Sequence, residues 1–316
     1  MNILRSLTLG LSLTLLLPLH ATTTSWAQTS GYVVPACTGD AKKDTPVLQQ
    51  AFARGGTILL PACEYWVSAT LRLKSGTTLI GTTYGASRIH SVISDGRPTI
   101  DSDPSVPLTN VHLADFQVNG RYGNGAIGAG DGFQLYGLTD STIERVKVAN
   151  FRGNGFAIKK PTGRSEGLVR TVFDSVFIIS TGTYAFDIDG TVDASWNMID
   201  IFSPSTGGYR FRAGSSSAPR IEITGLLAEW HKAYSGKDHV VMFDNPNGQS
   251  IRFRGCTAST FTTASPTNLS FVKAKGTVKV EFLGCTGGGG GGSKFKNWIS
   301  SPSRTVAYVT RINRVY

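Results

Sequence analysis

Charged side chains are scarce in this sequence: Asp, Glu, Lys and Arg together make up 16% of its 316 residues. Globular proteins average about 25%, and the shortfall argues against a largely helical chain. Glycine is abundant, with 37 residues, and valine, isoleucine, phenylalanine and threonine recur throughout. This composition favours many short strands joined by tight turns. The hydrophobic content of 40% is enough to build a sizeable core.

The chain has only four cysteines and no Cys-x-x-Cys pair, which argues against a zinc site. Four cysteines allow more than one disulfide pattern. Two lie early and two late, so local pairs are the simplest expectation: Cys37 with Cys63, and Cys256 with Cys285. The late cysteines both follow a glycine after matching apolar segments. They are expected to stack within bonding reach, with two buried thiols as the alternative.

Long apolar runs are absent beyond the first 27 residues. Residues 1–27 have the features of a signal peptide: an early arginine, the apolar stretch Leu7–Leu19, and the small residues Ser25 and Ala27 before a cleavage point. A membrane anchor is the alternative, but the apolar run is short for spanning a bilayer. We therefore expect a secreted protein, extracellular or periplasmic, with 28–316 as its mature domain and no membrane attachment. Export also permits disulfides.

The formal net charge is +10, and no run of lysines and arginines concentrates it. Outside the cell, a basic protein meets acidic glycans and cell surfaces more often than nucleic acid. No known nucleic-acid-binding motif is present, so no nucleic-acid partner is expected. The alternative is that the positive charge only keeps the protein soluble.

One short helix is expected near the N-terminus, over about residues 44–54. Thr45 can cap this helix, Pro46 suits its first position, and Gly55 can end it. After Gly56 the pattern changes to short segments of alternating polarity separated by turns, which is typical of strands.

A repeat becomes visible from residue 130. Segments with similar sequences place one large apolar residue at intervals of 23 to 32 residues: Phe133, Phe156, Phe186, Tyr209 and Val241. A second strand-like segment lies between each pair of these anchors. Two or three strands repeating at this period predict a coiled β solenoid, with loops of varied length at some turns.

Five segments carry a resemblance to a known family. They are Asp40–Phe52, Gly55–Pro61, Ser75–Gly81, Asp115–Gly120 and Val148–Gly155. Together they resemble the pectate-lyase-3 / rhamnogalacturonase-like superfamily of pectin-lyase-like proteins. The resemblance implies an all-β fold, a right-handed single-stranded parallel β-helix with a short N-terminal capping helix. It also implies a polysaccharide as the partner.

The resemblance does not extend to catalytic motifs. The Asn-Thr-Asp, Asp-Asp and Gly-His-Gly set of polygalacturonases is missing, as are the Arg-x-Pro-x-x-Arg of classical pectate lyases and the Asp-Pro-His-Asp of alginate epimerases. Cys63 and Glu64 also replace the usual Pro-Gly turn. Because the superfamily holds hydrolases, lyases, epimerases and phage tailspikes, the site has to be argued from geometry.

Aligning the repeats on their apolar anchors predicts one outward row of polar side chains. Residues one and three positions after an inward anchor point outward in a strand. The outermost row contains Tyr136, Lys159, Asp189, Arg212 and Asp244, and its charge alternates from Lys159 onward. We expect Asp187 and Asp189 to be catalytic, and Tyr136, Lys159, Arg210 and Arg212 to bind substrate. The alternative is a solvated ladder of ion pairs.

A second group of candidates follows a later strand. Glu229 and His231 could act as acid or base, and Trp230 between them could stack on a sugar ring. The alternative is an aromatic-packed loop with solvated charges. No cofactor is expected, except that a lyase could use calcium. Such a site needs several clustered acids, and only Asp187, Asp189 and Asp193 are candidates.

The expected function is a secreted polysaccharide-degrading enzyme, a lyase or a glycoside hydrolase, acting on an acidic extracellular glycan. The alternative is a non-catalytic glycan-binding or surface protein, or a tailspike-like one, on the same scaffold. A cleft where acids and an aromatic residue converge would favour the enzyme. A flat ladder of fully paired charges would favour binding.

Overall fold

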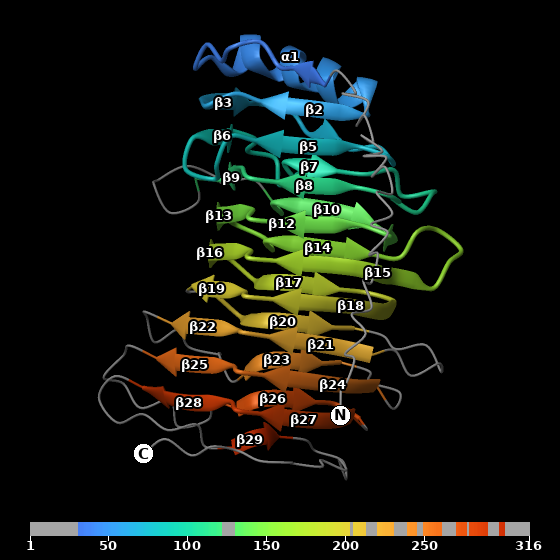
Figure 1. Ribbon diagram of the computed structural model, residues 1–316, viewed down its shortest axis with the longest axis vertical. Coiled ribbons are helices and arrows are strands. Elements are labelled where there is room, and N and C mark those ends of the chain that lie inside the picture. The colour runs from blue at the N-terminus through green and yellow to red at the C-terminus, as the bar shows by residue number, and fades with distance from the viewer. Residues whose placement is uncertain are drawn as a thin grey trace, which may run out of the picture. The chain divides into compact units, whose positions relative to one another are not determined.

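A computed structural model describes residues 31–121, 130–202, 205–212, 220–230, 239–244, 249–260, 270–276, 278–289 and 297–300. Within this part the chain forms one helix, α1 (Ala41–Arg54), and short strands that wind into three parallel sheets. The fold is a right-handed parallel β-helix, as the sequence predicts. Figure 1 shows the strands stacked in chain order, with α1 over the N-terminal end.

The first sheet has eleven strands. They are β1 (Tyr32–Val33), β2 (Thr57–Leu60), β5 (Thr78–Gly81), β8 (His112–Ala114), β11 (Leu138–Thr139), β12 (Thr142–Glu144), β15 (Glu166–Asp174), β18 (Thr191–Asn197), β21 (Arg220–Thr224), β24 (Gln249–Arg254) and β27 (Val278–Leu283). Both β11 and β12 pair with β15. The register between β15 and β18 shifts twice along their length.

The second sheet has nine strands. They are β3 (Cys63–Val67), β6 (Ser87–Ser91), β9 (Gln117–Asn119), β13 (Lys147–Phe151), β16 (Phe177–Thr181), β19 (Asp200–Phe202), β22 (Leu227–Trp230), β25 (Thr257–Thr260) and β28 (Thr286–Gly289).

The third sheet also has nine strands. They are β4 (Leu71–Arg72), β7 (Ile100–Asp101), β10 (Phe133–Tyr136), β14 (Phe156–Lys159), β17 (Tyr184–Ile188), β20 (Gly207–Phe211), β23 (His239–Phe243), β26 (Ser270–Ala274) and β29 (Asn297–Ser300). In each full turn, or coil, the chain passes from the first sheet to the second and then to the third.

The corner between the first and second sheets has a constant geometry. A single residue with positive φ makes the turn in successive coils, including Asp115 (62°), Arg145 (49°), Ser175 (53°) and Met198 (51°). Glycine takes this position in the later coils, where a positive φ costs no steric strain. The residue that follows points inward and is buried in every case: Phe116, Val146, Val176, Ile199, Leu226, Cys256 and Cys285.

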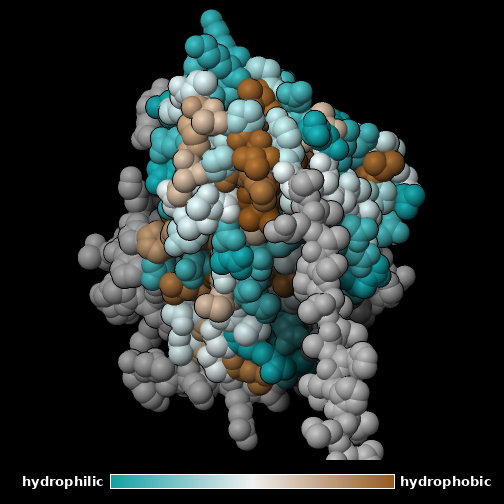
Figure 2. Space-filling view, turned by 45° about the horizontal axis from the view of Figure 1, so that its top comes forward, coloured by the Kyte–Doolittle hydropathy of each residue, from teal (hydrophilic) through white to brown (hydrophobic). Residues whose placement is uncertain are grey.

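The predicted inward anchors are buried, which confirms the alignment of the coils. Phe133 pairs in register with Phe156, Phe156 with Phe186, and Phe186 with Tyr209. Their rings stack with centroid distances of 4.6, 5.3 and 4.9 Å. This spacing follows from the strand separation of about 4.8 Å, because each of these anchors packs on the anchor of the next coil. Outside the core, hydrophobic patches are interrupted by hydrophilic ones on the face that Figure 2 shows.

The capping helix begins earlier than predicted. Asp40, not Thr45, is its N-cap, because the Asp40 carboxylate accepts a hydrogen bond from the Lys42 N–H (2.9 Å). Pro46 therefore lies inside the second turn instead of at the first position. Thr45 is buried, and its hydroxyl accepts a hydrogen bond from the Ser68 N–H. Leu48 and Phe52 cover the apolar end of the first coil.

Both predicted disulfides are present. Cys37 bonds Cys63 and so ties the segment before α1 to β3. Cys256 bonds Cys285 between adjacent coils, in the inward position that follows the corner residue. The predicted signal peptide, residues 1–27, lies outside the described residues. No helix within the described part is both long enough and apolar enough to cross a membrane.

Candidate functional site

The outward face of the third sheet carries the predicted polar row. Gln134, Ala157, Asp187, Arg210 and Met242 pair successively in register along β10, β14, β17, β20 and β23. Tyr136 and Lys159 pair two residues further along their strands. For these residues the register agrees with the predicted alternation, whereas Asp189, Arg212 and Asp244 follow the ends of their strands.

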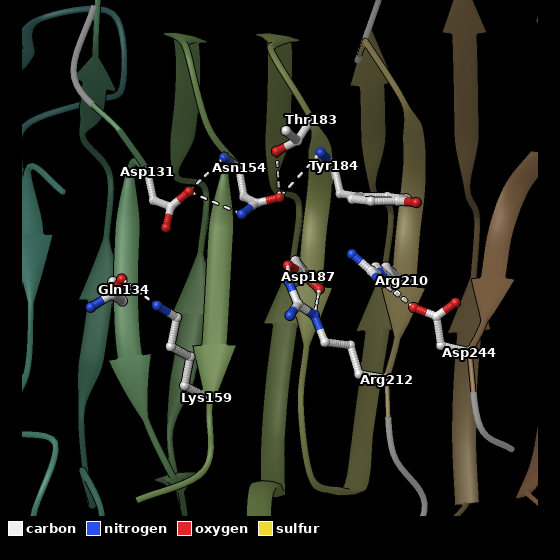
Figure 3. A network of polar contacts seen from close by, with 10 residues as sticks. All are labelled: Asp131, Gln134, Asn154, Lys159, Thr183, Tyr184, Asp187, Arg210, Arg212 and Asp244. Carbon is white, nitrogen blue, oxygen red and sulfur yellow. Dashed lines mark hydrogen bonds and ion pairs between the residues drawn. The ribbon is translucent and has the colours of Figure 1, made fainter. Parts of the chain in front are cut away.

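The ion pairs on this face run diagonally and do not follow the row of alternating charge from Lys159 to Asp244. Arg212 forms a bidentate pair with Asp187, with its Nε 2.7 Å from Oδ1 and its second nitrogen on Oδ2. Arg210 Nε donates to Asp244 (2.5 Å), and Lys275 Nζ bonds the other oxygen of Asp244 at 2.8 Å. Figure 3 shows the Arg212 and Arg210 pairs on neighbouring strands.

Asp187 is less accessible than an outward residue was expected to be. Its side chain is 6% exposed, since Arg212 lies over it. By contrast, the Asp189 side chain is 32% exposed, and its nearest cation is Lys160 at 3.6 Å. Of the two predicted catalytic aspartates, only Asp189 is therefore open to a ligand.

A hollow of about 390 Å³ opens on this face of the third sheet. We call it the β14 hollow, because Ala157 to Lys159 of β14 line it. Its other charged and polar lining residues are Tyr136, Lys160, Arg164, Asp187, Asp189 and Arg212. Five residues predicted for the site, Tyr136, Lys159, Asp187, Asp189 and Arg212, thus meet here, and Arg210 lies one strand away from Asp187 in register.

Lys160 and Arg164 were missed from the sequence. They belong to the loop between β14 and β15, where the strand alternation used for the prediction has ended. The loop is held in place because the Thr162 N–H donates to the Pro104 carbonyl (2.9 Å). It also packs on Gly137, where a Cβ would lie only 2.6 Å from Pro161 Cγ.

A polar network lies at the start of the third sheet's strands (Figure 3). Asp131 Oδ1 accepts from the backbone N–H of Asn154 (2.7 Å) and from its Nδ2 (2.9 Å). Asn154 Oδ1 in turn accepts from the Thr183 hydroxyl (2.6 Å) and the Tyr184 N–H (3.2 Å). The alternation of inward and outward residues along a strand gave no prediction here, because Asp131 and Asn154 lie at a corner between sheets.

Burial raises the pKa of Asp131 above its ordinary value, although hydrogen bonds from Asn154 and the charge of Lys159 oppose this shift. The charge of Asp187 adds to it. Nearby, Lys159 Nζ donates to Gln134 Oε1 (2.6 Å), and Gln134 Nε2 donates to the Tyr136 hydroxyl (3.0 Å). Burial also raises the pKa of Tyr136, with a further contribution from the charge of Asp101.

The second predicted group does not join this site. Glu229 lies on β22 of the second sheet, in register with Phe202 and Ser259, whereas Asp187 belongs to the third sheet. The side chain of Trp230 and the whole of His231 lie outside the described residues. The described part of the chain thus gives Glu229 no place at the β14 hollow.

The acids considered for calcium are also separated. Asp193 lies on β18 of the first sheet, away from Asp187 and Asp189 in the sheet order. Across the described ranges, no cluster of three His, Cys, Asp or Glu side chains could hold a metal ion. The three predicted acids therefore do not fit a calcium site.

Comparison with known proteins identifies the fold. No protein-family model matches this chain. No curated protein matches it either. Among solved structures, the enzymatically active domain of bacteriophage CBA120 tailspike protein 2 superposes with a TM-score of 0.62 and 14% identity, over 90% of this chain and 47% of that one. This likeness supports the right-handed parallel β-helix fold.

Two further β-helix neighbours have similar scores. ORF18 of Geobacillus virus E2 has a TM-score of 0.56 and 15% identity, over 88% of this chain and 61% of that one. The Streptococcus pneumoniae surface adhesin PfbA has a TM-score of 0.56 and 13% identity, over 87% and 80%. This chain thus spans less than two thirds of the length of the two viral proteins. At these identities the likeness shows the fold alone.

Proposed function

We propose that this β-helix protein binds and cleaves an acidic extracellular polysaccharide at the β14 hollow. One observation carries the proposal. Four cations, two carboxylates and a tyrosine hydroxyl surround a single open hollow on one face of the solenoid. A long polymer can extend from such a hollow along the sheet face in both directions.

The charge balance of the hollow favours an acidic ligand. Lys159, Lys160, Arg164 and Arg212 outnumber the two carboxylates. Lys159 hydrogen-bonds the neutral Gln134, and the described residues include no carboxylate in ion-pair contact with Lys159 or Arg164. Uronic-acid carboxylates would form charge-assisted hydrogen bonds with these cations.

The same residues can support bond cleavage. Asp189 is partly exposed and only loosely paired with Lys160, so it is available as a base. Cations beside a uronate would stabilise the negative charge that develops when a proton is removed next to its carboxylate. A carboxylate base also serves hydrolysis, where it activates water. The tailspike neighbour, described as enzymatically active, is in keeping with an enzyme on this scaffold.

A non-catalytic glycan-binding protein is the second candidate. Asp187 and Asp244 are both held by arginines, so much of the row is a closed ladder of ion pairs. The neighbour described as a surface adhesin has the same fold. In this case the hollow would hold an acidic glycan without cleaving it.

Both proposed functions, cleavage and binding of a glycan, require export from the cytoplasm. Two disulfides support it, because such bonds persist in oxidising compartments. We propose that the protein acts in the extracellular space or the periplasm, which is where its glycan would be met.

Incubation with a panel of acidic and neutral polysaccharides tests the proposal. Ultraviolet absorbance of unsaturated uronates reports elimination, and new reducing ends without this absorbance report hydrolysis. Each reaction is run with added calcium and with a chelator. We expect cleavage of at least one acidic polymer and none of the neutral ones. Binding of acidic polymers without cleavage would favour the second candidate, and neither binding nor cleavage would overturn both.

A further inference from the structure

Two side chains that line the β14 hollow, Lys159 and Tyr136, are joined through Gln134, which does not line it. Lys159 Nζ donates to Gln134 Oε1 (2.6 Å), and Gln134 Nε2 donates to the Tyr136 hydroxyl (3.0 Å). Lys159 and Tyr136 also pair in register on the adjacent strands β14 and β10. Figure 3 shows Lys159 extending from β14 to Gln134 on β10. The amide of Gln134 therefore bridges an ammonium group and a hydroxyl at the border of the hollow.

Lys159 fixes the orientation of this amide. An ammonium group can only donate hydrogen bonds, so the atom of Gln134 that faces Lys159 must be the oxygen. The amide nitrogen then faces Tyr136. Because an amide N–H can only donate, the Tyr136 oxygen must accept in this contact. The hydroxyl proton of Tyr136 is consequently not used by Gln134.

The hydroxyl proton of Tyr136 has no other acceptor in the described part of the chain. Asp101 lies on the neighbouring strand β7, but its carboxylate bonds Arg72 at 2.9 Å and is not hydrogen-bonded to Tyr136. Burial raises the pKa of Tyr136, and the charge of Asp101 adds to this, so the hydroxyl stays protonated at neutral pH. Tyr136 therefore keeps one O–H that it can donate to a ligand.

Lys159 also keeps most of its binding capacity. Its ammonium group has three N–H donors, and the bond to Gln134 uses one of them. Because Gln134 is neutral, this bond leaves the positive charge of Lys159 uncompensated, whereas Asp187 balances the charge of Arg212. A carboxylate at position 134 would cancel the charge of Lys159 and accept the Tyr136 proton. The amide thus holds both groups without using up what they offer to a ligand.

The free donors of Lys159 and Tyr136 suit a carboxylate. The Gln134 amide already bridges the two groups with an oxygen and a nitrogen attached to one carbon. A carboxylate has two oxygens in nearly the same planar arrangement, and both accept. A carboxylate that enters from the hollow can therefore bond Lys159 with one oxygen and Tyr136 with the other, opposite the amide. A sugar hydroxyl has a single oxygen and cannot bridge the two groups in this way.

We propose that Lys159 and Tyr136 together bind one carboxylate of the glycan, and that Gln134 is the positioning residue that sets these two donors. This inference rests on the proposed function and names the chemical group that the hollow recognises, a free uronate carboxylate. It holds for a protein that cleaves the glycan and for one that only binds it.

The test measures the affinity of the protein for polygalacturonate, alginate and hyaluronan by isothermal titration calorimetry. Each polymer is compared with the same polymer after reduction of its carboxylates to alcohols. Wild type should bind at least one acidic polymer, and the reduced form about tenfold or more weakly, because charge-assisted hydrogen bonds are lost. Tyr136→Phe should weaken binding of the acidic polymer by about tenfold and change binding of the reduced polymer less than about threefold.

Tyr84→Phe is the matched control for the loss of a hydroxyl. Tyr84 is 50% exposed and lies between β5 and β6, outside the third sheet. This variant should bind both forms of each polymer as wild type does. An equal loss in Tyr84→Phe and Tyr136→Phe would overturn the inference.

A double-mutant cycle tests the role of Gln134. Gln134→Met nearly keeps the length of the side chain but can hold neither Lys159 nor Tyr136, so it should weaken binding of the acidic polymer by about tenfold. If Gln134 acts through Tyr136, the two losses do not multiply, and the variant with both changes should bind nearly as well as the weaker single variant. Gln134→Glu keeps the shape of the side chain and should lose at least as much affinity, which provides the test if Gln134→Met does not fold.

The outcomes separate this inference from the proposed function. Wild type that binds an acidic polymer, with Tyr136→Phe and Gln134→Glu binding it equally well, would overturn the inference and leave the proposed function standing. Equal losses for the acidic and the reduced polymer in Tyr136→Phe would overturn the recognition of a carboxylate. Losses that multiply in the double variant would overturn the positioning role of Gln134. A wild-type protein that binds none of the acidic polymers would overturn the inference together with the proposed function.

Discussion

Arg212 bonds both carboxylate oxygens of Asp187, although the register continued from Ile188 and Phe211 places it beside Asp189. The long guanidinium side chain reaches back along the neighbouring strand and shields Asp187 from water. The two aspartates, only two residues apart, therefore have different environments. Asp187 is a fixed partner in an ion pair, and Asp189 is open toward the hollow.

Replacing these two aspartates should separate stability from function. Asp187→Asn should lower the free energy of unfolding by about 1–3 kcal/mol, since it removes charged hydrogen bonds from a buried group. Asp189→Asn should cost less than about 1 kcal/mol, as for an exposed ion pair, but should reduce turnover by about a hundredfold. Urea unfolding at pH 7 and the polysaccharide assay measure the two effects. Equal stability losses in both variants would contradict the assignment.

The cations of the hollow should control affinity for an acidic polymer. Lys159→Glu or Arg164→Glu should weaken binding by about tenfold or more, because each replaces an attraction with a repulsion. The effect should shrink as salt is added, since these side chains are partly exposed to solvent. The matched control is Arg170→Glu, which changes an exposed arginine that pairs with Asp140, outside the third sheet. A similar loss of binding in the control would point to overall charge instead of the hollow.

Asp244 should make stability depend on acid pH. Burial alone would raise its pKa, but hydrogen bonds from Lys275 and Arg210 outweigh this and hold the pKa below its ordinary value. The folded protein thus binds this proton more weakly than the unfolded chain. Its contribution is fully present above the unfolded pKa of about 4 and is lost as pH falls through the folded value.

Asp244→Asn should accordingly lower the melting temperature at pH 7, and the difference from wild type should shrink steadily below about pH 4. Thermal unfolding followed by circular dichroism at several pH values measures this. A difference that stays constant down to the lowest pH at which the protein folds would show that the charge of Asp244 contributes nothing.

The Cys37–Cys63 bond should stabilise the cap. Cys37→Ser combined with Cys63→Ser should lower the free energy of unfolding by about 2–4 kcal/mol, because the bond restricts a loop with a sequence separation of 26 in the unfolded chain. Cys256→Ser with Cys285→Ser, which opens a separation of 29, gives a comparison at the other end of the solenoid. Unchanged stability in the variant that lacks Cys37 and Cys63 would show that their bond does not stabilise the cap.

The fold could be predicted because its determinants are local and repeat. Large apolar residues such as Phe133, Phe156 and Phe186 recur once per coil, and each stacks on the next. Alternation then identified Asp187 and Arg212 as outward residues. It could not decide between Asp187 and Asp189 as the partner of Arg212, since a long side chain can reach either.

Other parts of the site depend on contacts that the once-per-coil sequence repeat does not predict. Lys160 reaches Asp189 from a loop, and Asp131 lies at a corner where the alternation of the strands is broken. The helix start was misplaced for a related reason. Asp40 and Thr45 are both suitable caps, and the choice follows from tertiary contacts of Asp44, whose carboxylate accepts from the Thr38 and Trp66 N–H groups.

Gly153→Ala should disturb the Asp131–Asn154 network without altering any charged or hydrogen-bonding side chain. Its Cβ would lie 2.3 Å from Asp131 Oδ1 and 2.6 Å from the Gly130 carbonyl oxygen, so the carboxyl group must move away from Asn154. We expect the free energy of unfolding to fall by about 1–3 kcal/mol, as for an overpacked site. Gly85→Ala is the matched control, since its Cβ would meet only Thr83 Oγ1 at 3.7 Å. Melting temperature and urea unfolding are measured for both variants. A Gly153→Ala protein as stable as Gly85→Ala would show that the position of Asp131 is not fixed by its contact with Asn154.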